Sequence, residues 1–453
     1  MTRSQPAASA LPGAADRRAP AYTAHIESPR ASRITHFDGL RGFAALAVVL
    51  HHFYLLFYVS IDAPLNSYLL QSPLMIALNG GLAVYVFFVL SGYVLSAKYF
   101  STGDARVTLK MAAARYPRLA IPAFAALAVA TIAVRSGWFE QYLNTARIFD
   151  AHAFGPSAWM SAPSVGEAVR AGLVGIFFNS GAGAASPDPP LWTMYVEFAG
   201  SFMVFGLCLA LRNTALRMLS YSLLTLVIGG CGRTIQAFVG IEPDYLIAFV
   251  VGMAYADVTN SPVLRATASL ASRSRPMLLS VVVVLTLLAA QLSAVAYIMP
   301  ELRAPLTPIY GRLARTYLAY NSLLNTVTAA LIVILANESR VLRSWLSSAA
   351  GFFFGKISFA LYLVHWTVMV TIACFVFLRL YAATGNYAVS AACASVCGLV
   401  LSILAAFIFE RAIDAPAIKV SRTFGAGLVD AFFRQGTDLP AATAELPSPR
   451  ATI

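Results

Sequence analysis

The chain has 453 residues, of which 59% are hydrophobic and only 11% are charged. Soluble domains carry about 25% charged residues, so this composition excludes an ordinary soluble protein and indicates an integral membrane protein. The net charge of +12 would suggest a nucleic-acid partner for a soluble chain, but the positions of the charges have a simpler explanation and we expect no such partner.

Apolar runs recur along the sequence, and each is long enough to cross a hydrocarbon core of about 30 Å as a helix. None shows the alternation typical of membrane β-strands. The predicted fold class is therefore an all-α polytopic membrane protein with about ten transmembrane helices, at residues 43–60, 80–98, 119–135, 191–211, 215–232, 243–257, 277–298, 319–336, 357–378 and 387–410.

Basic residues concentrate on one side of these spans. If the N-terminus is cytoplasmic, the inside segments hold 24 of the 32 Lys and Arg residues, which is the positive-inside pattern. We therefore expect both termini in the cytoplasm. The predicted domains are a disordered tail at 1–36, a membrane domain at 37–416 and a cytoplasmic tail at 417–453.

The five cysteines lie within or at the edge of apolar spans. Cys393 and Cys397 are one helical turn apart, but no nearby His or carboxylate completes a set of metal ligands. We interpret the cysteines as small buried side chains and predict neither a metal site nor a disulfide framework.

The first predicted span carries ionisable residues that a lipid-facing helix would avoid. It begins after Asp38, which is placed to cap the helix or to pair with Arg41 one turn later. Arg41 and His52 are eleven residues apart, which returns a helix to within about 20° of its starting direction, about 16 Å further along the axis. The two side chains share one face, and ionisable groups inside a membrane helix indicate a functional site.

The second span and the basic segment after it contain candidates for ligand binding. Ser91-Gly92 lies in the inner half of that span, where small residues allow either close helix packing or contact between a ligand and the backbone. The segment 98–118 then holds five basic residues, including Arg115 and Arg118. These cations fit plain topology, attraction of lipid phosphates, or binding of a phosphorylated cosubstrate.

Glu197 is a carboxylate inside the fourth predicted span, about 7 Å deeper than Trp192. Such a group is either protonated or paired with an arginine such as Arg41, or it accepts a proton or orients a histidine in a polar cavity. The long connection before this span includes residues 165–178, which predict a short amphipathic or re-entrant helix and not a further span.

The ninth span carries a polar stripe, because Ser358, Tyr362 and His365 occupy positions i, i+4 and i+7 of one helix face. With a cytoplasmic N-terminus, His52 and His365 lie at nearly the same depth, and Glu197 lies somewhat above them. A polar cavity near the midplane that is reached from both sides would contain all three side chains.

Five motifs in order resemble the membrane acyltransferase-3 family. They are Arg41 with ten residues before His52, Phe-Phe-Val-Leu-Ser-Gly-Tyr at 87–93, Arg-Tyr-Pro-Arg-Leu-x-x-Pro at 115–122, Leu-Trp-Thr-x-x-x-Glu at 191–197, and Ile-Ser-Phe-Ala-Leu-Tyr-Leu-Val-His-Trp at 357–366. The fourth motif departs from the pattern of many members, which carry a second acidic residue and an aromatic pair where this chain has residues 194–200.

The resemblance implies an enzyme of the bacterial inner membrane that transfers an acyl group, usually acetyl from cytoplasmic acetyl-CoA, to a hydroxyl of a carbohydrate or lipid-linked acceptor. Acyl-CoA is then a cosubstrate, and no bound cofactor is expected. It also implies that Arg41 and His52 are the paired essential residues, that Arg115 and Arg118 face the acyl-CoA, and that Glu197 belongs to the working cavity.

In the mechanism that we expect, His52 accepts the proton of the acceptor hydroxyl, and Arg41 positions His52 or the acyl donor. Glu197 or His365 stabilises the imidazolium or relays the proton. Direct transfer and an acyl-enzyme intermediate are both compatible with these residues. Ser91 is assigned to acyl-CoA binding, and supporting roles are assigned to Asp38, Ser358 and Tyr362.

An alternative from another class is a proton-coupled transporter or flippase, in which the same buried His and Glu relay protons. A catalytically dead binding or regulatory member is disfavoured because both Arg41 and His52 are present.

Overall fold

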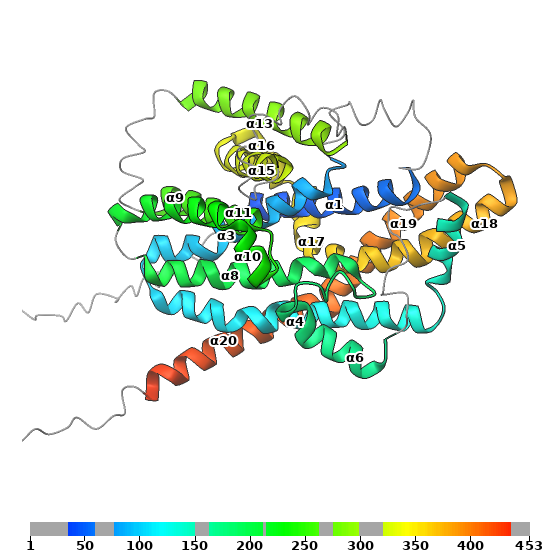
Figure 1. Cartoon of the computed structure of the whole chain (residues 1–453), viewed down its shortest axis with the longest axis horizontal. Coiled ribbons are helices and arrows are strands. Elements are labelled where there is room, and N and C mark those ends of the chain that lie inside the picture. Colours follow the sequence, from blue (N-terminus) through cyan, green and yellow to red (C-terminus); the bar gives the residue numbers. More distant parts are fainter. Residues whose placement is uncertain are drawn as a thin grey trace, which may run out of the picture. The chain divides into compact units, whose positions relative to one another are not determined.

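The computed structural model describes residues 35–58, 77–149, 163–211, 214–261, 275–298 and 320–435. Every regular element in these ranges is helical, which confirms the predicted all-α class (Figure 1). The predicted N-terminal tail, residues 1–36, lies outside the described residues except for its last two positions.

A helix occupies each of the ten segments that the apolar runs predict. These helices are α1 Thr35–Phe57, α3 Gly80–Thr102, α4 Ala105–Arg135, α8 Trp192–Ala210, α9 Thr214–Gly230, α11 Pro243–Asn260, α13 Arg275–Ile298, α15 Tyr320–Glu338, α17 Ala349–Val368 and α19 Tyr387–Phe409.

Six helical stretches within the described residues are long and apolar enough to cross a membrane. The number becomes seven if α9 and the short α10, Gly232–Val239, form one span that is bent by 75°. The total of ten spans stays a prediction.

Short helices connect the long ones. They are α5 Glu140–Phe149, α6 Val165–Arg170, the π-helical turn η4 Ala171–Gly175, α7 Ile176–Phe178, the 3₁₀ turn η5 Pro189–Leu191 and α16 Arg340–Leu346. The stretch 165–178 is thus a short helical run, as predicted. It begins at a capping box in which Ser164 and Glu167 each accept a hydrogen bond from the backbone N–H of the other.

Helices α1 and α17 approach closely because glycines line their contact. A Cβ atom on Gly42 would collide with the backbone of Phe354 and Gly355, and one on Gly355 would lie 2.5 Å from the Asp38 carbonyl oxygen. Gly92 of the Ser91-Gly92 pair likewise lets α3 approach α11, because a Cβ atom on Gly92 would collide with the backbone of Phe249. Small residues let two membrane helices pack backbone to backbone.

The C-terminal helices run further than the sequence predicts. After α17, the π-turn η8 Met369–Ala373 leads into α18 Cys374–Thr384, and after α19 the π-turn η9 Glu410–Asp414 leads into α20 Ala415–Gln435. Figure 1 shows α20, in red, beside α4, with which it makes many contacts.

The predicted boundary at residue 416, where the tail 417–453 would begin, falls inside helix α20, and the domain division stays a prediction. Residues up to Gln435 form a packed helix, and Lys110 Nζ of α4 lies 2.7 Å from Asp430 Oδ1 of α20. Pro416 lies just after the π-turn η9, inside the helical stretch that continues from α19. Residues 436–453 lie outside the described part of the chain.

Candidate active site

His52 of α1 and His365 of α17 are joined by a hydrogen bond. The distance from His52 Nδ1 to His365 Nε2 is 2.8 Å, and the two rings are nearly parallel, at 6°. His365 is fully buried, whereas His52 keeps part of its surface accessible. The structure thus brings these two side chains together, while their depth in a membrane and their chemical roles stay predictions.

The hydrogen bonds assign the tautomers of this pair when both rings are neutral. His365 Nδ1 lies 3.0 Å from the Leu361 carbonyl oxygen, which only accepts, so His365 Nδ1 carries the proton. His365 Nε2 is then the acceptor, and His52 Nδ1–H donates to it. The lone pair of His52 consequently lies on Nε2, where it can take a proton from a ligand.

His51 lies next to this pair but serves a different purpose. Its Nδ1 donates to the Leu78 carbonyl oxygen over 2.8 Å, and its ring packs against Gly80, the first residue of α3. The ring centroids of His51 and His52 are 5.7 Å apart. His51 therefore fixes the start of α3 against α1.

Glu197 of α8 forms a second cluster with Arg115 of α4. One carboxylate oxygen accepts from the Arg115 guanidinium and, over 2.7 Å, from the Ser91 hydroxyl of α3. Arg115 Nε also donates to Ser201 Oγ over 2.8 Å. These hydrogen bonds satisfy a carboxylate and a guanidinium that burial would otherwise penalise.

Arg118 lies one turn further along α4 and pairs with Asp414 of η9. Arg118 Nη1 is 2.5 Å from Asp414 Oδ1, and the guanidinium also lies over the Phe359 ring of α17. Both arginines that the sequence assigns to acyl-CoA are thus paired with carboxylates in the absence of a ligand. A phosphate that bound there would replace one anion by another.

Tyr362 connects α17 to the beginning of α8. Its hydroxyl donates to the Pro190 carbonyl oxygen over 2.9 Å and lies 2.9 Å from Thr193 Oγ1, while its ring centroid is 6.1 Å from that of His365. Thr193 and Glu197 are one turn apart on α8, so this helix links the histidine pair to the arginine cluster. Ser358, on the same stripe of α17, is buried and donates to the Gly355 carbonyl oxygen.

Arg41 and Asp38 lie in the first two turns of α1, at the opposite end of that helix from His52. Arg41 and Arg118 are both electrostatic neighbours of Arg115. Arg41 and Arg118 thus lie near Arg115, which alone of the three pairs with Glu197 within the described residues, and no contact joins Arg41 to His52 there.

Two acidic residues near the candidate site are not predicted from the sequence. Asp414 lies in a charged stretch that looked like a helix stop, and only the fold brings it to Arg118. Asp188 precedes the Leu-Trp-Thr motif, is fully buried, and has no hydrogen-bond partner for either carboxylate oxygen within the described residues. Among those residues, no group of His, Cys, Asp and Glu side chains is arranged to hold a metal ion.

A family model described as an acyltransferase domain matches residues 34–411. The chain belongs to the acyltransferase 3 family. The match begins at α1 and ends inside η9, so both groups of polar residues in this acyltransferase-family chain lie within it. No curated protein and no solved structure matches the chain.

Proposed function

We propose that this chain is a membrane O-acyltransferase that moves an acetyl group from acetyl-CoA to a hydroxyl of a carbohydrate acceptor. Membership of the acyltransferase 3 family supports the transfer of an acyl group. The observation that carries the chemistry is the hydrogen-bonded chain from the Leu361 carbonyl through His365 to His52. It leaves a basic nitrogen, His52 Nε2, on a partly accessible side chain.

In this proposal the acceptor hydroxyl gives its proton to His52 Nε2 while its oxygen attacks the thioester carbonyl carbon. The tetrahedral intermediate collapses, the carbon–sulfur bond breaks, and the same proton passes from His52 to the CoA thiolate. The products are an acyl ester and free CoA. His365 stabilises the transient imidazolium, because its Nε2 accepts a hydrogen bond from His52 Nδ1–H throughout.

Arg115 and Arg118 are the proposed ligands of the acyl-CoA phosphates, and Glu197, which accepts from Ser91, holds Arg115 in place together with Ser201. Arginine suits this role because its planar guanidinium binds phosphate through two parallel hydrogen bonds. Arg41 adds a third positive charge to the same cluster. The acceptor, the acetyl donor and a location in the bacterial inner membrane are all parts of the proposal.

The test compares two neighbouring histidines. Purified protein in liposomes receives acetyl-CoA with a labelled acetyl group and an extract of envelope glycans, and labelled glycan is measured. We expect His52→Ala to lower the transfer rate by about a thousandfold. His51→Ala is the matched control, because the His51 imidazole donates to the Leu78 carbonyl oxygen and packs against Gly80.

Equal losses in the two variants would contradict the assignment of His52 as the base. Uptake or export of a solute by protein that transfers no acetyl group to any glycan would contradict the acyltransferase proposal itself.

A further inference from the structure

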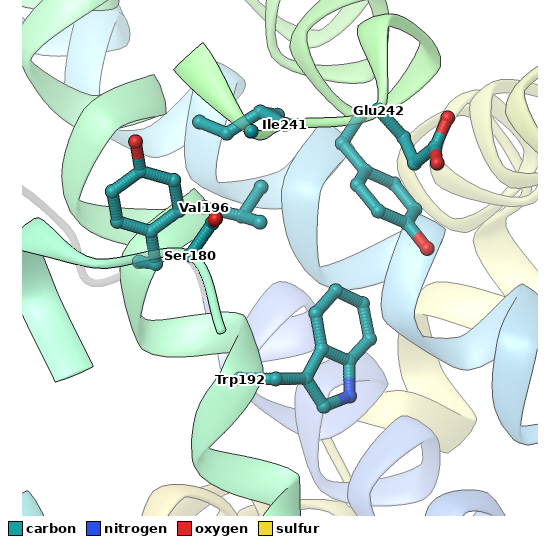
Figure 2. Close-up of a pocket in the computed structure, with 8 residues that line it drawn as sticks. Ser180, Trp192, Val196, Ile241 and Glu242 are labelled. Carbon is teal, nitrogen blue, oxygen red and sulfur yellow. The ribbon is translucent and has the colours of Figure 1, made fainter. Parts of the chain in front are cut away.

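A pocket of about 300 Å³ opens where α8, α10 and α11 meet. Its walls include the partly exposed rings of Trp192, Tyr195 and Tyr245, together with the Glu242 carboxylate and the Ser180 hydroxyl. Figure 2 shows Trp192 on the opposite side of the pocket from Ile241 and Glu242. The volume is at the lower end of the range for small-molecule sites, which favours a ligand part of about one ring.

The turn between α10 and α11 forms one wall of this pocket. Helix α10 ends at Val239, and Gly240, which caps it, has a φ of +69°. A Cβ atom on Gly240 would collide with the Ser180 side chain, so glycine allows the two walls to meet. Irregular backbone between membrane helices occurs where it is buried in protein or lines a cavity.

The aromatic rings are held in place by their neighbours. The ring centroids of Trp192 and Tyr245 lie 5.5 Å apart at 40°, and Tyr245 also packs edge-on against Phe88 at 5.2 Å. Gln236 donates a hydrogen bond to one Glu242 carboxylate oxygen. Two supported aromatic faces beside an oriented carboxylate suit a flat ligand that has apolar faces and a hydroxyl-bearing edge.

We propose that this pocket binds one pyranose ring of the acceptor. The C–H groups of the ring pack on Trp192 and Tyr245, and its hydroxyls donate to the Glu242 carboxylate. The inference rests on the proposed function and deepens it, because it assigns a site to the acceptor.

The pocket is connected to the histidine pair through α8. Thr193 follows Trp192 directly, lies 2.9 Å from the Tyr362 hydroxyl, and Tyr362 lies beside His365. Thr193 and Tyr362 therefore lie between a ring held at Trp192 and the histidine pair. A phosphocholine headgroup would also suit aromatic rings beside a carboxylate, but it has no free hydroxyl to receive the acyl group.

The first experiment measures binding by saturation-transfer NMR on the full-length protein in lipid nanodiscs. The probes are methyl pyranosides of glucose, galactose, mannose and rhamnose, with phosphocholine as a separate probe. We expect transfer to at least one pyranoside, and a loss of about tenfold in Tyr245→Leu and Trp192→Leu. Tyr245→Phe keeps the ring and should bind as the wild type does.

The control variant is Trp138→Leu, because Trp138 is an exposed tryptophan outside the pocket. If Tyr245→Leu fails to fold, Glu242→Gln tests the same site without removing a ring, and we expect it to weaken binding. Binding of phosphocholine alone, or pyranoside binding that none of the pocket variants changes, would overturn the proposal.

The second experiment separates this inference from the proposed function. In the acetyl-transfer assay with envelope glycans, we expect Tyr245→Leu to raise the KM for glycan by about tenfold and to leave the KM for acetyl-CoA unchanged. Acetyl transfer with an unchanged glycan KM would overturn the pocket and leave the proposed function standing. Pyranoside binding that depends on Tyr245 in a protein without transfer activity would support the pocket and contradict the proposed function.

Discussion

At the scale of single residues, the most informative contact is the hydrogen bond between His52 and His365. An imidazole has two nitrogens, and only one of them can face a substrate while the other is held. The backbone carbonyl of Leu361 decides which one, through His365. In the proposed mechanism His365 is therefore a positioning residue, which acts on the substrate only through His52.

This role predicts a particular kinetic change in His365→Phe. The ring is retained but the acceptor for His52 Nδ1–H is lost, so the imidazolium loses its partner and the tautomer is no longer fixed. We expect kcat to fall by about a hundredfold while the KM for acetyl-CoA stays the same. Steady-state kinetics on the liposome assay checks this, and a change confined to KM would contradict it.

Asp188 predicts an effect of pH on stability. Burial raises the pKa of this carboxyl well above its usual range, so the folded protein holds a proton that the unfolded chain releases. The free energy of unfolding therefore decreases as pH rises from about 4 towards the folded pKa, because the unfolded chain releases this proton more easily than the folded protein does. In Asp188→Asn this loss is absent.

Thermal unfolding of both proteins between about pH 5 and pH 8 measures the effect, with the pH window set by the reference pKa of aspartate. We expect the melting temperature of Asp188→Asn, relative to that of the wild type, to increase as pH rises. A difference that is the same at every pH would show that Asp188 is ionised in the folded protein.

At the scale of helices, the glycine-lined contact between α1 and α17 sets the register that places His52 against His365. Gly42 lies about 15 Å along α1 from His52, so it cannot touch a substrate held there. A Cβ at Gly42 must nevertheless separate the helices, because it meets the backbone of Phe354 and Gly355.

We therefore expect Gly42→Ala to lower kcat by about tenfold or more, because small displacements of a catalytic group are costly. Gly206→Ala is the matched control, because a Cβ on Gly206 in α8 would meet nothing within 4 Å. Acetyl transfer by purified protein measures both, and equal activities would show that the α1–α17 register tolerates the change.

Helices are also the scale at which the sequence was most informative. A run of about twenty apolar residues can bury its backbone polar groups in lipid only as a helix, so composition alone predicts these elements. Depth along each helix follows from the rise per residue, and this placed His52 and His365 at one level.

Rotation about the helix axes does not follow from that reasoning. The sequence offered Arg41 as a partner for Glu197, and the fold supplies Arg115. Likewise, Asp414 meets Arg118 only because η9 lies beside α4, and the pocket at Trp192 forms only where the turn at 240–242 meets α8. Such contacts depend on packing between distant helices, which one sequence does not encode in a local pattern.

At the scale of the whole molecule, the distribution of basic residues predicts the orientation in the membrane. We expect a green fluorescent protein fused after residue 453 to fluoresce, because it would lie in the cytoplasm, and alkaline phosphatase fused within residues 61–75 to be active outside. An active phosphatase at the C-terminus would contradict the predicted topology.

The length of the helical stretch from α19 to α20 also constrains how the chain sits in a membrane. Residues 387–434 form one helical stretch of 48 residues, which at 1.5 Å per residue is about 72 Å and exceeds the membrane core of about 30 Å. Part of it must therefore lie outside the hydrocarbon. The pairing of Lys110 with Asp430 places that part beside the first half of α4.

The hydrogen bond between His52 and His365 joins positions that are 313 residues apart in the chain. A ribosome needs roughly 15 to 60 seconds to synthesise the intervening residues at ordinary rates. Throughout that time α1 is in place without the partner that fixes its base. In the proposed mechanism the tautomer of His52 is therefore fixed only after α17 has been inserted, so a truncated or stalled product would transfer acyl groups slowly.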